Sequence, residues 1–166
     1  MISEETILNI KRELEKARTE EDVKMRVGPF LDRKAKELGL EMAEYEHRLE
    51  VSGERIDALY SKVIIEYKSP GYLTELGFHE AAGQVISYIE NLSKQSGLNQ
   101  SLYFSAIIDG KRIGFVRFSE VESRWIKIRP QEINDTNLSR ILNAMRGLGR
   151  KEGQLREADR RTAGQL

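Results

Sequence analysis

The segment from Val63 to Gly71, with the sequence VIIEYKSPG, leaves few options for the fold. Its run of β-branched and aromatic residues predicts a β-strand, and a strand this apolar belongs inside a sheet rather than at its edge. Alternation along the strand places Glu66 and Lys68 on one face and Tyr67 on the other. Burying charged groups is unfavourable unless they are compensated, so this face carries either an ion pair or a functional site.

Hydrophobic periodicity divides the rest of the chain into helices and strands. Apolar residues at helical spacing predict helices at 4–17, 20–38, 76–96 and 134–146. Alternating or buried apolar runs predict strands at 42–51, 55–60, 62–68, 101–108, 112–118 and 125–130. Thr19 and Asp22 predict a capping box at the start of the second helix, and Pro29 predicts a bend or break within it.

The order of these elements predicts an α/β fold. The first three strands follow one another through short turns, which favours an antiparallel meander, and the next helix crosses over to further strands. We therefore expect one central mixed β-sheet flanked by helices, with functional residues at the ends of the central strands. The 166 residues suit one domain, expected at 1–148. The polar segment 149–166 is expected to be a tail or a linker into a longer chain.

Composition excludes several classes of site and location. The absence of cysteine excludes disulfides and thiolate metal sites, and two histidines are too few for a histidine-rich cage. A metal would therefore be bound by carboxylates. No apolar run approaches the ~18 residues that span a bilayer, and the charged N-terminus does not resemble a secretory signal. No membrane association is expected, and the default location is cytoplasmic.

Charge is balanced overall but unevenly distributed. The 27 basic residues equal the 27 acidic ones, which gives no general attraction to nucleic acid. Basic residues nevertheless outnumber acidic ones after residue 110. Residues in or beside the expected strands there could contact phosphate, with an ordinary solvated surface as the alternative; they are Lys111, Arg112, Arg117, Arg124, Lys127 and Arg129.

The expected hairpin brings three charged side chains together. Asp57 precedes Glu66 by nine residues, so its strand lies beside the strand of Glu66 and Lys68. Carboxylates are hard ligands that bind Mg²⁺, and enzymes that hydrolyse phosphodiesters with the help of a metal use such ligands. An ammonium group next to them suits charge neutralisation in the transition state or the positioning of a water. The alternative is a simple ion pair of Glu66 and Lys68 on an exposed edge.

Asp57, followed by Glu66-Tyr67-Lys68, resembles the core motif of the PD-(D/E)xK nuclease superfamily, although Ile56 stands where the name of the superfamily has proline. Gln84 and Tyr88 on the next helix look like the Gln-x-x-x-Tyr signature of its RecB-like branch. Their spacing of four residues puts both on one helical face.

The resemblance also implies an acidic residue on a helix before the strands. Glu20 and Glu21 are the two candidates. Glu20 shares the core-facing stripe with Val23 and Val27, whereas Glu21 lies on the side of Met25, so we favour Glu20.

Residues 15–148 as a whole resemble the N-terminal nuclease domain of type I restriction subunits and of type IIG restriction enzymes. The resemblance implies a restriction-endonuclease-like sandwich, DNA as substrate, and Mg²⁺ as cofactor with Mn²⁺ as substitute. It also implies helicase or methyltransferase domains in the parent chain. Cleavage of both strands would need two sites, which makes a homodimer on DNA plausible.

The resemblance assigns a role to each residue of the motif. Asp57, Glu66 and the backbone carbonyl of Tyr67 would bind the metal, and Glu20 would complete or orient its ligands. Lys68 would assist the water. Gln84 and Tyr88 would hold Lys68 or the scissile phosphate.

Two other functions fit the same residues. One is a catalytically inactive domain of this fold that binds nucleic acid or a protein partner. The other is a stand-alone nuclease of DNA repair or recombination. His79 could contact phosphate or be a solvated or capping residue, and Tyr72 and Trp125 could stack on bases or serve as packing groups.

Overall fold

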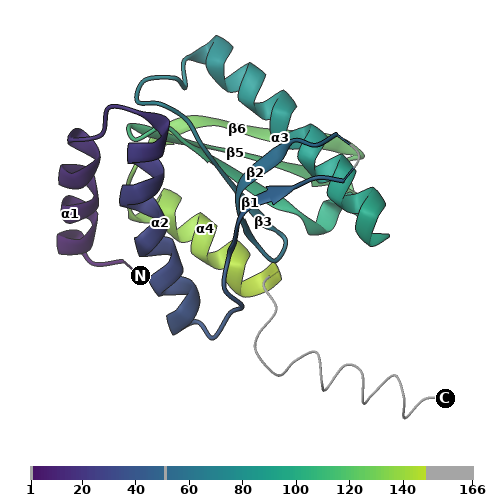
Figure 1. The fold of residues 1–166 in the computed structure, drawn as a ribbon, viewed down its shortest axis with the longest axis horizontal. Helices are drawn as coiled ribbons and strands as arrows, with labels where there is room; N and C mark the ends of the chain where they lie inside the picture. Colours follow the sequence, from purple (N-terminus) through teal and green to yellow (C-terminus); the bar gives the residue numbers. More distant parts are fainter. Residues whose placement is uncertain (1, 51, 149–166) are drawn as a thin grey trace.

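The computed structural model describes residues 2–50 and 52–148 (Figure 1). Its helices are α1 (Glu4–Glu15), α2 (Glu20–Glu37), α3 (Glu75–Ser96) and α4 (Asp135–Leu148), with a 3₁₀ turn at Gln100–Leu102. Its strands are β1 (Glu44–Arg48), β2 (Arg55–Tyr60), β3 (Val63–Tyr67), β4 (Phe104–Ile108), β5 (Arg112–Ser119) and β6 (Arg124–Glu132). The polar segment predicted at 149–166 lies outside the described residues.

The six strands form one mixed sheet in the order β1-β2-β3-β4-β5-β6. β1, β2 and β3 form an antiparallel meander, β3 and β4 pair in parallel, and the last three strands are antiparallel. A parallel pair needs a long crossover, and α3 supplies it. The predicted α/β fold with a central mixed sheet is confirmed, and so is the interior position of β3.

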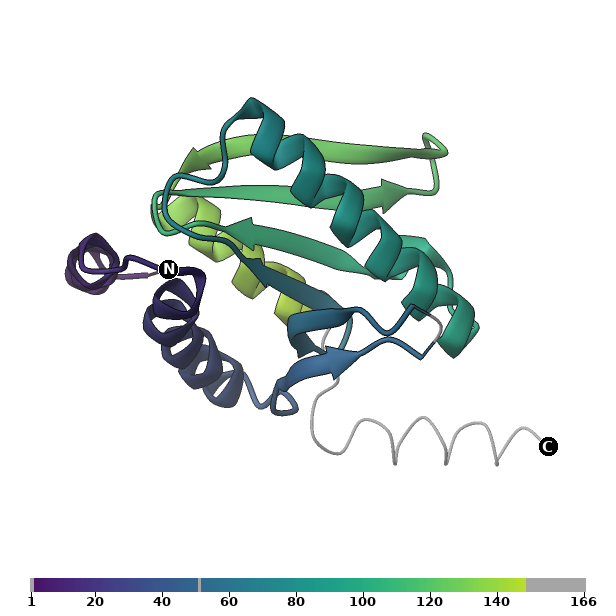
Figure 2. The same ribbon diagram turned by 45° about the horizontal axis from the view of Figure 1, so that its top comes forward.

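Helices cover both faces of the sheet, and each face has its own core. α2 and α4 pack on one face, with α1 against α2, and residues such as Val27, Ile65 and Ile141 are buried there. α3 packs on the other face with Ile64, Val85 and Ile107. Figure 2 shows α3 crossing one face of the sheet while α4 lies behind it. In the described part of the chain, no helix carries a continuous apolar stretch that would cross a lipid bilayer.

Helix α2 begins with the predicted capping box, in which Thr19 and Asp22 satisfy each other's backbone N–H groups. It then continues through Pro29, so of the predicted bend or break the break is wrong. Proline removes the N–H that would donate to the carbonyl of Met25. Pro29 and Met25 are both exposed, so water can hydrate that carbonyl without disturbing the buried side of the helix.

Two strand boundaries also differ from the prediction. β1 is shorter than the expected 42–51, and β4 begins at Phe104 rather than at residue 101. Asn99 explains the second difference, because its side chain accepts a hydrogen bond from the N–H of Ser101 at 2.9 Å and caps the 3₁₀ turn. A side chain that bonds to nearby backbone competes with strand pairing.

A tight turn sets the register that matters for function. Tyr60 pairs with Val63, so only two residues join β2 to β3. Ala58 consequently pairs with Ile65. Just beyond this pair, Asp57 accepts a hydrogen bond from the N–H of Tyr67, which places it beside the end of β3 that carries Glu66.

Gly77, in the first turn of α3, lies against the connection from β3. A Cβ atom at Gly77 would be 1.9 Å from the carbonyl oxygen of Tyr72. That connection is also held from the sheet, because the buried Asp109 accepts a hydrogen bond from the N–H of Leu73 at 2.9 Å. Glycine is therefore required where α3 meets this backbone.

We expect Gly77→Ala to lower the free energy of unfolding by about 1–3 kcal/mol, because the Tyr72 backbone must shift. Gly83 in the same helix is the matched control, since a Cβ there meets nothing within 4 Å. Gly83→Ala should raise the free energy of unfolding by about 0.5–1 kcal/mol. Urea titrations followed by circular dichroism measure both changes, and an unaltered Gly77→Ala protein would contradict the contact.

Candidate metal centre

Three carboxylates from three different elements meet at one end of the sheet. Glu20 comes from the first turn of α2, Asp57 from β2 and Glu66 from β3. Each offers one oxygen, and these three oxygens all lie within 4.8 Å of one another. Of the two glutamates considered at the start of α2, the structure brings Glu20 into this group and not Glu21. We call Glu20, Asp57 and Glu66 the carboxylate cluster.

The three carboxylates of the cluster differ in their exposure to solvent. Glu20 is exposed, Asp57 is partly buried, and Glu66 is only 3% exposed. Asp57 accepts a hydrogen bond from the N–H of Tyr67 at 2.8 Å, which ties its carboxylate to the strand that carries Glu66. The side of the cluster formed by Glu20 is therefore the one open to a ligand.

Burial and mutual repulsion perturb both inner acids. Desolvation, followed by the nearby charge of Asp57, raises the pKa of Glu66 to about 9 although Lys68 opposes the shift. Desolvation also raises the pKa of Asp57 to about 6, with the Tyr67 N–H bond opposing it and Glu20 adding to it. Acids that lie this close favour protonation unless a cation compensates them.

One oxygen of Glu66 has no partner among the described residues. Its Oε2 is buried and accepts no hydrogen bond, whereas Oε1 lies 3.6 Å from the Nζ of Lys68. A buried acceptor without a partner is rare in folded proteins. Together with two further carboxylate oxygens close by, this atom fits a bound cation.

Lys68 is fixed from several sides. Its Nζ donates to Oε1 of Gln84 at 2.9 Å and lies 5.2 Å from the centre of the Tyr72 ring. The contact of Gln84 with Lys68, implied by the family resemblance, is present. Tyr72, considered for base stacking or packing, places its ring face beside the ammonium group, where a cation is attracted.

Tyr67 and Tyr88 are held in different surroundings. The Tyr67 side chain lies on the α2 face, fully buried, with no hydrogen-bond partner for its hydroxyl among the described residues. Tyr88 is 1% exposed in the core beneath α3, where desolvation and the charge of Glu66 raise its pKa well above the usual value. Of the Gln-x-x-x-Tyr pair, Gln84 is hydrogen-bonded to Lys68, and no hydrogen bond joins Tyr88 to Lys68 in the described residues.

Sequence reasoning missed two charged residues beside the cluster. The Nζ of Lys24 forms an ion pair with Glu46, and both charges act on Asp57. Lys24 follows Glu20 by four residues, and this spacing on one helical face was a signal that could have identified it. Glu46 gave no such signal, because its position depends on a left-handed residue within β1, with φ of 53°.

The remaining candidates lie apart from the cluster. His79 is exposed near the start of α3. Trp125 is partly buried and packs edge-on against Phe118, with ring centres 5.2 Å apart, as expected for a packing group.

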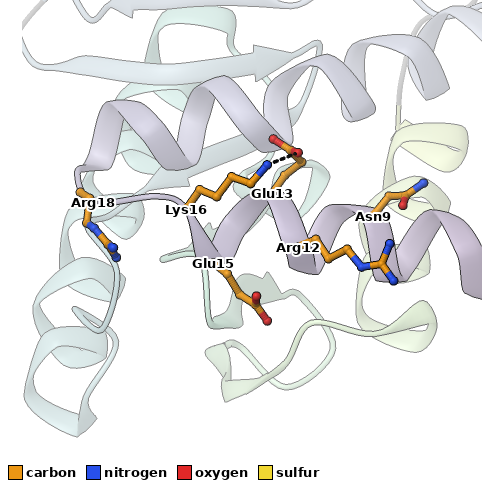
Figure 3. A pocket seen from close by; sticks show the side chains of 6 residues that line it. All are labelled: Asn9, Arg12, Glu13, Glu15, Lys16 and Arg18. Atoms are coloured by element: carbon orange, nitrogen blue, oxygen red, sulfur yellow. Dashed lines mark hydrogen bonds and ion pairs between the residues drawn. The ribbon is translucent and has the colours of Figure 1, made fainter.

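An open hollow of about 720 Å³ lies along α1, where Figure 3 shows its lining side chains on the helix and just beyond its end. Opposite charges offset one another there, because Glu13 binds Lys16 at 3.2 Å and Arg26 at 2.6 Å. We interpret this hollow as a solvated helix face.

Comparison of the chain with models of protein families, with curated proteins and with solved structures finds no match. The class that the structure defines is an α/β protein with a six-stranded mixed sheet flanked by helices. The geometry of the carboxylate cluster and Lys68 is the observation from which a function can be inferred.

We expect the free energy of unfolding of Glu66→Gln to exceed that of the wild type by about 2 kcal/mol at pH 8.5 in metal-free buffer. At pH 5 the two proteins should have similar free energies of unfolding. The pKa of Glu66 rises from 4.5 to about 9 on folding, so its contribution to stability is complete below pH 4.5 and is lost as the pH rises towards 9. Glutamine cannot ionise and escapes this loss. Urea titrations in a chelator at both pH values measure the difference.

The exposed Glu120 provides the control. Glu120→Gln should show no gain that depends on pH. A Glu66→Gln protein that is no more stable than the wild type at pH 8.5 would contradict the burial of an uncompensated acid.

Proposed function

We propose that the chain is a Mg²⁺-dependent DNA endonuclease domain with a restriction-endonuclease-like fold, and that it serves as the cleavage module of a restriction-modification enzyme. One observation carries the proposal: oxygens of Glu20, Asp57 and Glu66 lie within 4.8 Å of one another. The Nζ of Lys68 lies 3.6 Å from Glu66, so an ammonium group accompanies the three acids.

The donor set fits a hard divalent cation. Carboxylate oxygens suit Mg²⁺, with Mn²⁺ as a substitute, and the unpartnered Oε2 of Glu66 is available as a ligand. Glu20, Asp57 and Glu66 would hold the ion, with the Tyr67 carbonyl implied as a further ligand by the resemblance. Bound there, the ion would polarise a phosphate and lower the pKa of a water molecule.

Lys68 supplies the fixed positive charge of the site. Its side chain is only 13% exposed and is oriented by Gln84 and by the ring of Tyr72. A compact ammonium held in this way can stabilise negative charge that develops on a phosphate, or orient the attacking water. Partial exclusion of solvent strengthens this interaction relative to one in bulk water.

The choice of DNA as substrate follows from the resemblance of residues 15–148 to nuclease domains of restriction enzymes. The same resemblance supports helicase or methyltransferase domains as partners in the parent chain. A single carboxylate cluster would cut one strand, so double-strand cleavage would require two copies of the domain on DNA.

We expect 10 mM Mg²⁺ or Mn²⁺ to raise the melting temperature of the wild type by about 2–4 °C, because the ion binds only the folded cluster. Asp57→Asn and Glu20→Gln should lose this rise. Glu21→Gln, one residue from Glu20 but outside the cluster, should keep it. Differential scanning calorimetry of the four proteins with and without metal makes the measurement, and an equal rise in all of them would remove the metal from the proposal.

We expect the wild type to nick supercoiled plasmid DNA with Mg²⁺ or Mn²⁺, and Asp57→Asn, Glu66→Gln and Lys68→Ala to nick it at least about 100-fold more slowly. Calcium should support binding without cleavage, because it accepts oxygen ligands but activates water poorly. Glu21→Gln should retain activity. A wild type that binds DNA but never nicks it would favour the inactive binding domain over the nuclease.

A further inference from the structure

A second polar hollow lies on the α3 side of the sheet, separate from the carboxylate cluster. It measures about 370 Å³ and is bounded by the start of α3 and by strands β5 and β6. Leu73 and Phe78 form its buried apolar floor. Its charged rim consists of Arg112, Lys127, Arg129 and Glu75, with His79 beside them. We call this feature the basic hollow.

The basic hollow has an excess of positive charge. Arg112, Lys127 and Arg129 are all exposed, and none of the three forms an ion pair within the described residues. Glu75 is the single acid among the residues that line the hollow. An exposed group of arginine and lysine side chains without carboxylate partners favours an anionic ligand.

Strand geometry explains why the three cations gather. Lys127 and Arg129 are two residues apart on β6, which puts them on one face of the sheet. Lys127 pairs with Val116, whose side chain packs under α3. Arg112 precedes Val116 by four residues on β5, and because side chains alternate along a strand, Arg112 lies on the same, α3-covered face.

The basic hollow and the carboxylate cluster lie at the same end of the sheet. Glu66 pairs with Ile107, and Ile107 pairs with Gly114, two residues after Arg112. With strands about 4.8 Å apart, β5 and β6 lie roughly 10 and 14 Å across the sheet from β3. The connection from Lys68 to Leu73 runs directly from one site to the other.

We infer that the basic hollow binds backbone phosphates of the DNA strand beside the bond to be cleaved; the identity of this ligand rests on the proposed function. Phosphates of one strand rise by about 3.4 Å per nucleotide along the helix axis and lie farther apart through space, so the separation of the two sites corresponds to at most about three or four nucleotides. Contacts of this kind position a duplex without reading its sequence. The hollow thus holds flanking DNA while the carboxylate cluster holds the scissile phosphate.

The test compares two triple variants with equal loss of charge. The first is Arg112→Gln, Lys127→Gln and Arg129→Gln. The control is Arg12→Gln, Arg33→Gln and Lys94→Gln, which removes exposed cations from α1, from α2 and from the far end of α3. Fluorescence anisotropy of a labelled duplex in Ca²⁺ buffer, from 50 to 200 mM salt, gives the affinity and its salt dependence without cleavage.

We expect the hollow variant to bind DNA at least about tenfold more weakly at 100 mM salt, and the slope of log affinity against log salt to become shallower by about 2 to 3. The control should stay within about twofold of the wild type. Equal losses in both variants, or a wild type that does not bind the duplex, would overturn the inference.

A separate readout distinguishes this inference from the proposed nuclease. The hollow variant should keep the Mg²⁺-dependent rise in melting temperature, because its carboxylate cluster is intact. If the wild type shows neither that rise nor nicking while the hollow variant alone loses DNA affinity, the nuclease proposal fails and the hollow still binds DNA. If metal binding and nicking persist and the hollow variant binds DNA normally, only the inference about the hollow fails.

Discussion

The burial of the Glu66 carboxylate is the constraint on which the rest of the site depends. α3 packs over the face of β3 that carries Glu66, so this carboxylate is only 3% exposed and is poorly solvated. An acid in such a position needs compensation from the protein or from a ligand. Lys68 supplies part of it, from 3.6 Å, on one oxygen only. The crowding of Asp57 and Glu20 against Glu66 becomes favourable only if a cation joins them.

Local patterns made much of this arrangement predictable from the sequence. Strand alternation put Glu66 and Lys68 on one face, and the short turn after Tyr60 brought Asp57 to the end of β3, where it accepts a hydrogen bond from the N–H of Tyr67. Helical phase favoured Glu20 over its neighbour. Each of these inferences depends on residues that are close in the chain, where backbone geometry leaves few alternatives.

What the sequence did not reveal depends on long-range packing. Six basic residues formed one candidate surface in the sequence, yet the structure divides them: Arg112, Lys127 and Arg129 share the α3 face, whereas Arg117 lies on the opposite face of β5. Strand alternation alone does not say where the start of α3 lies over the sheet, and this position determines which cations line the hollow. A break at Pro29 was also wrongly considered, because the consequence of its missing N–H depends on whether the affected carbonyl meets solvent.

The parallel pairing of β3 with β4 has a consequence for folding during synthesis. β3 ends at Tyr67, and its partner strand begins only at Phe104. At translation rates of roughly 5–20 residues per second, the nascent chain carries a bare apolar strand edge for about two to seven seconds. An unpaired edge of this kind is a template for wrong pairing with other chains. The strand that carries the candidate site residues is therefore exposed to wrong pairing until β4 has been synthesised.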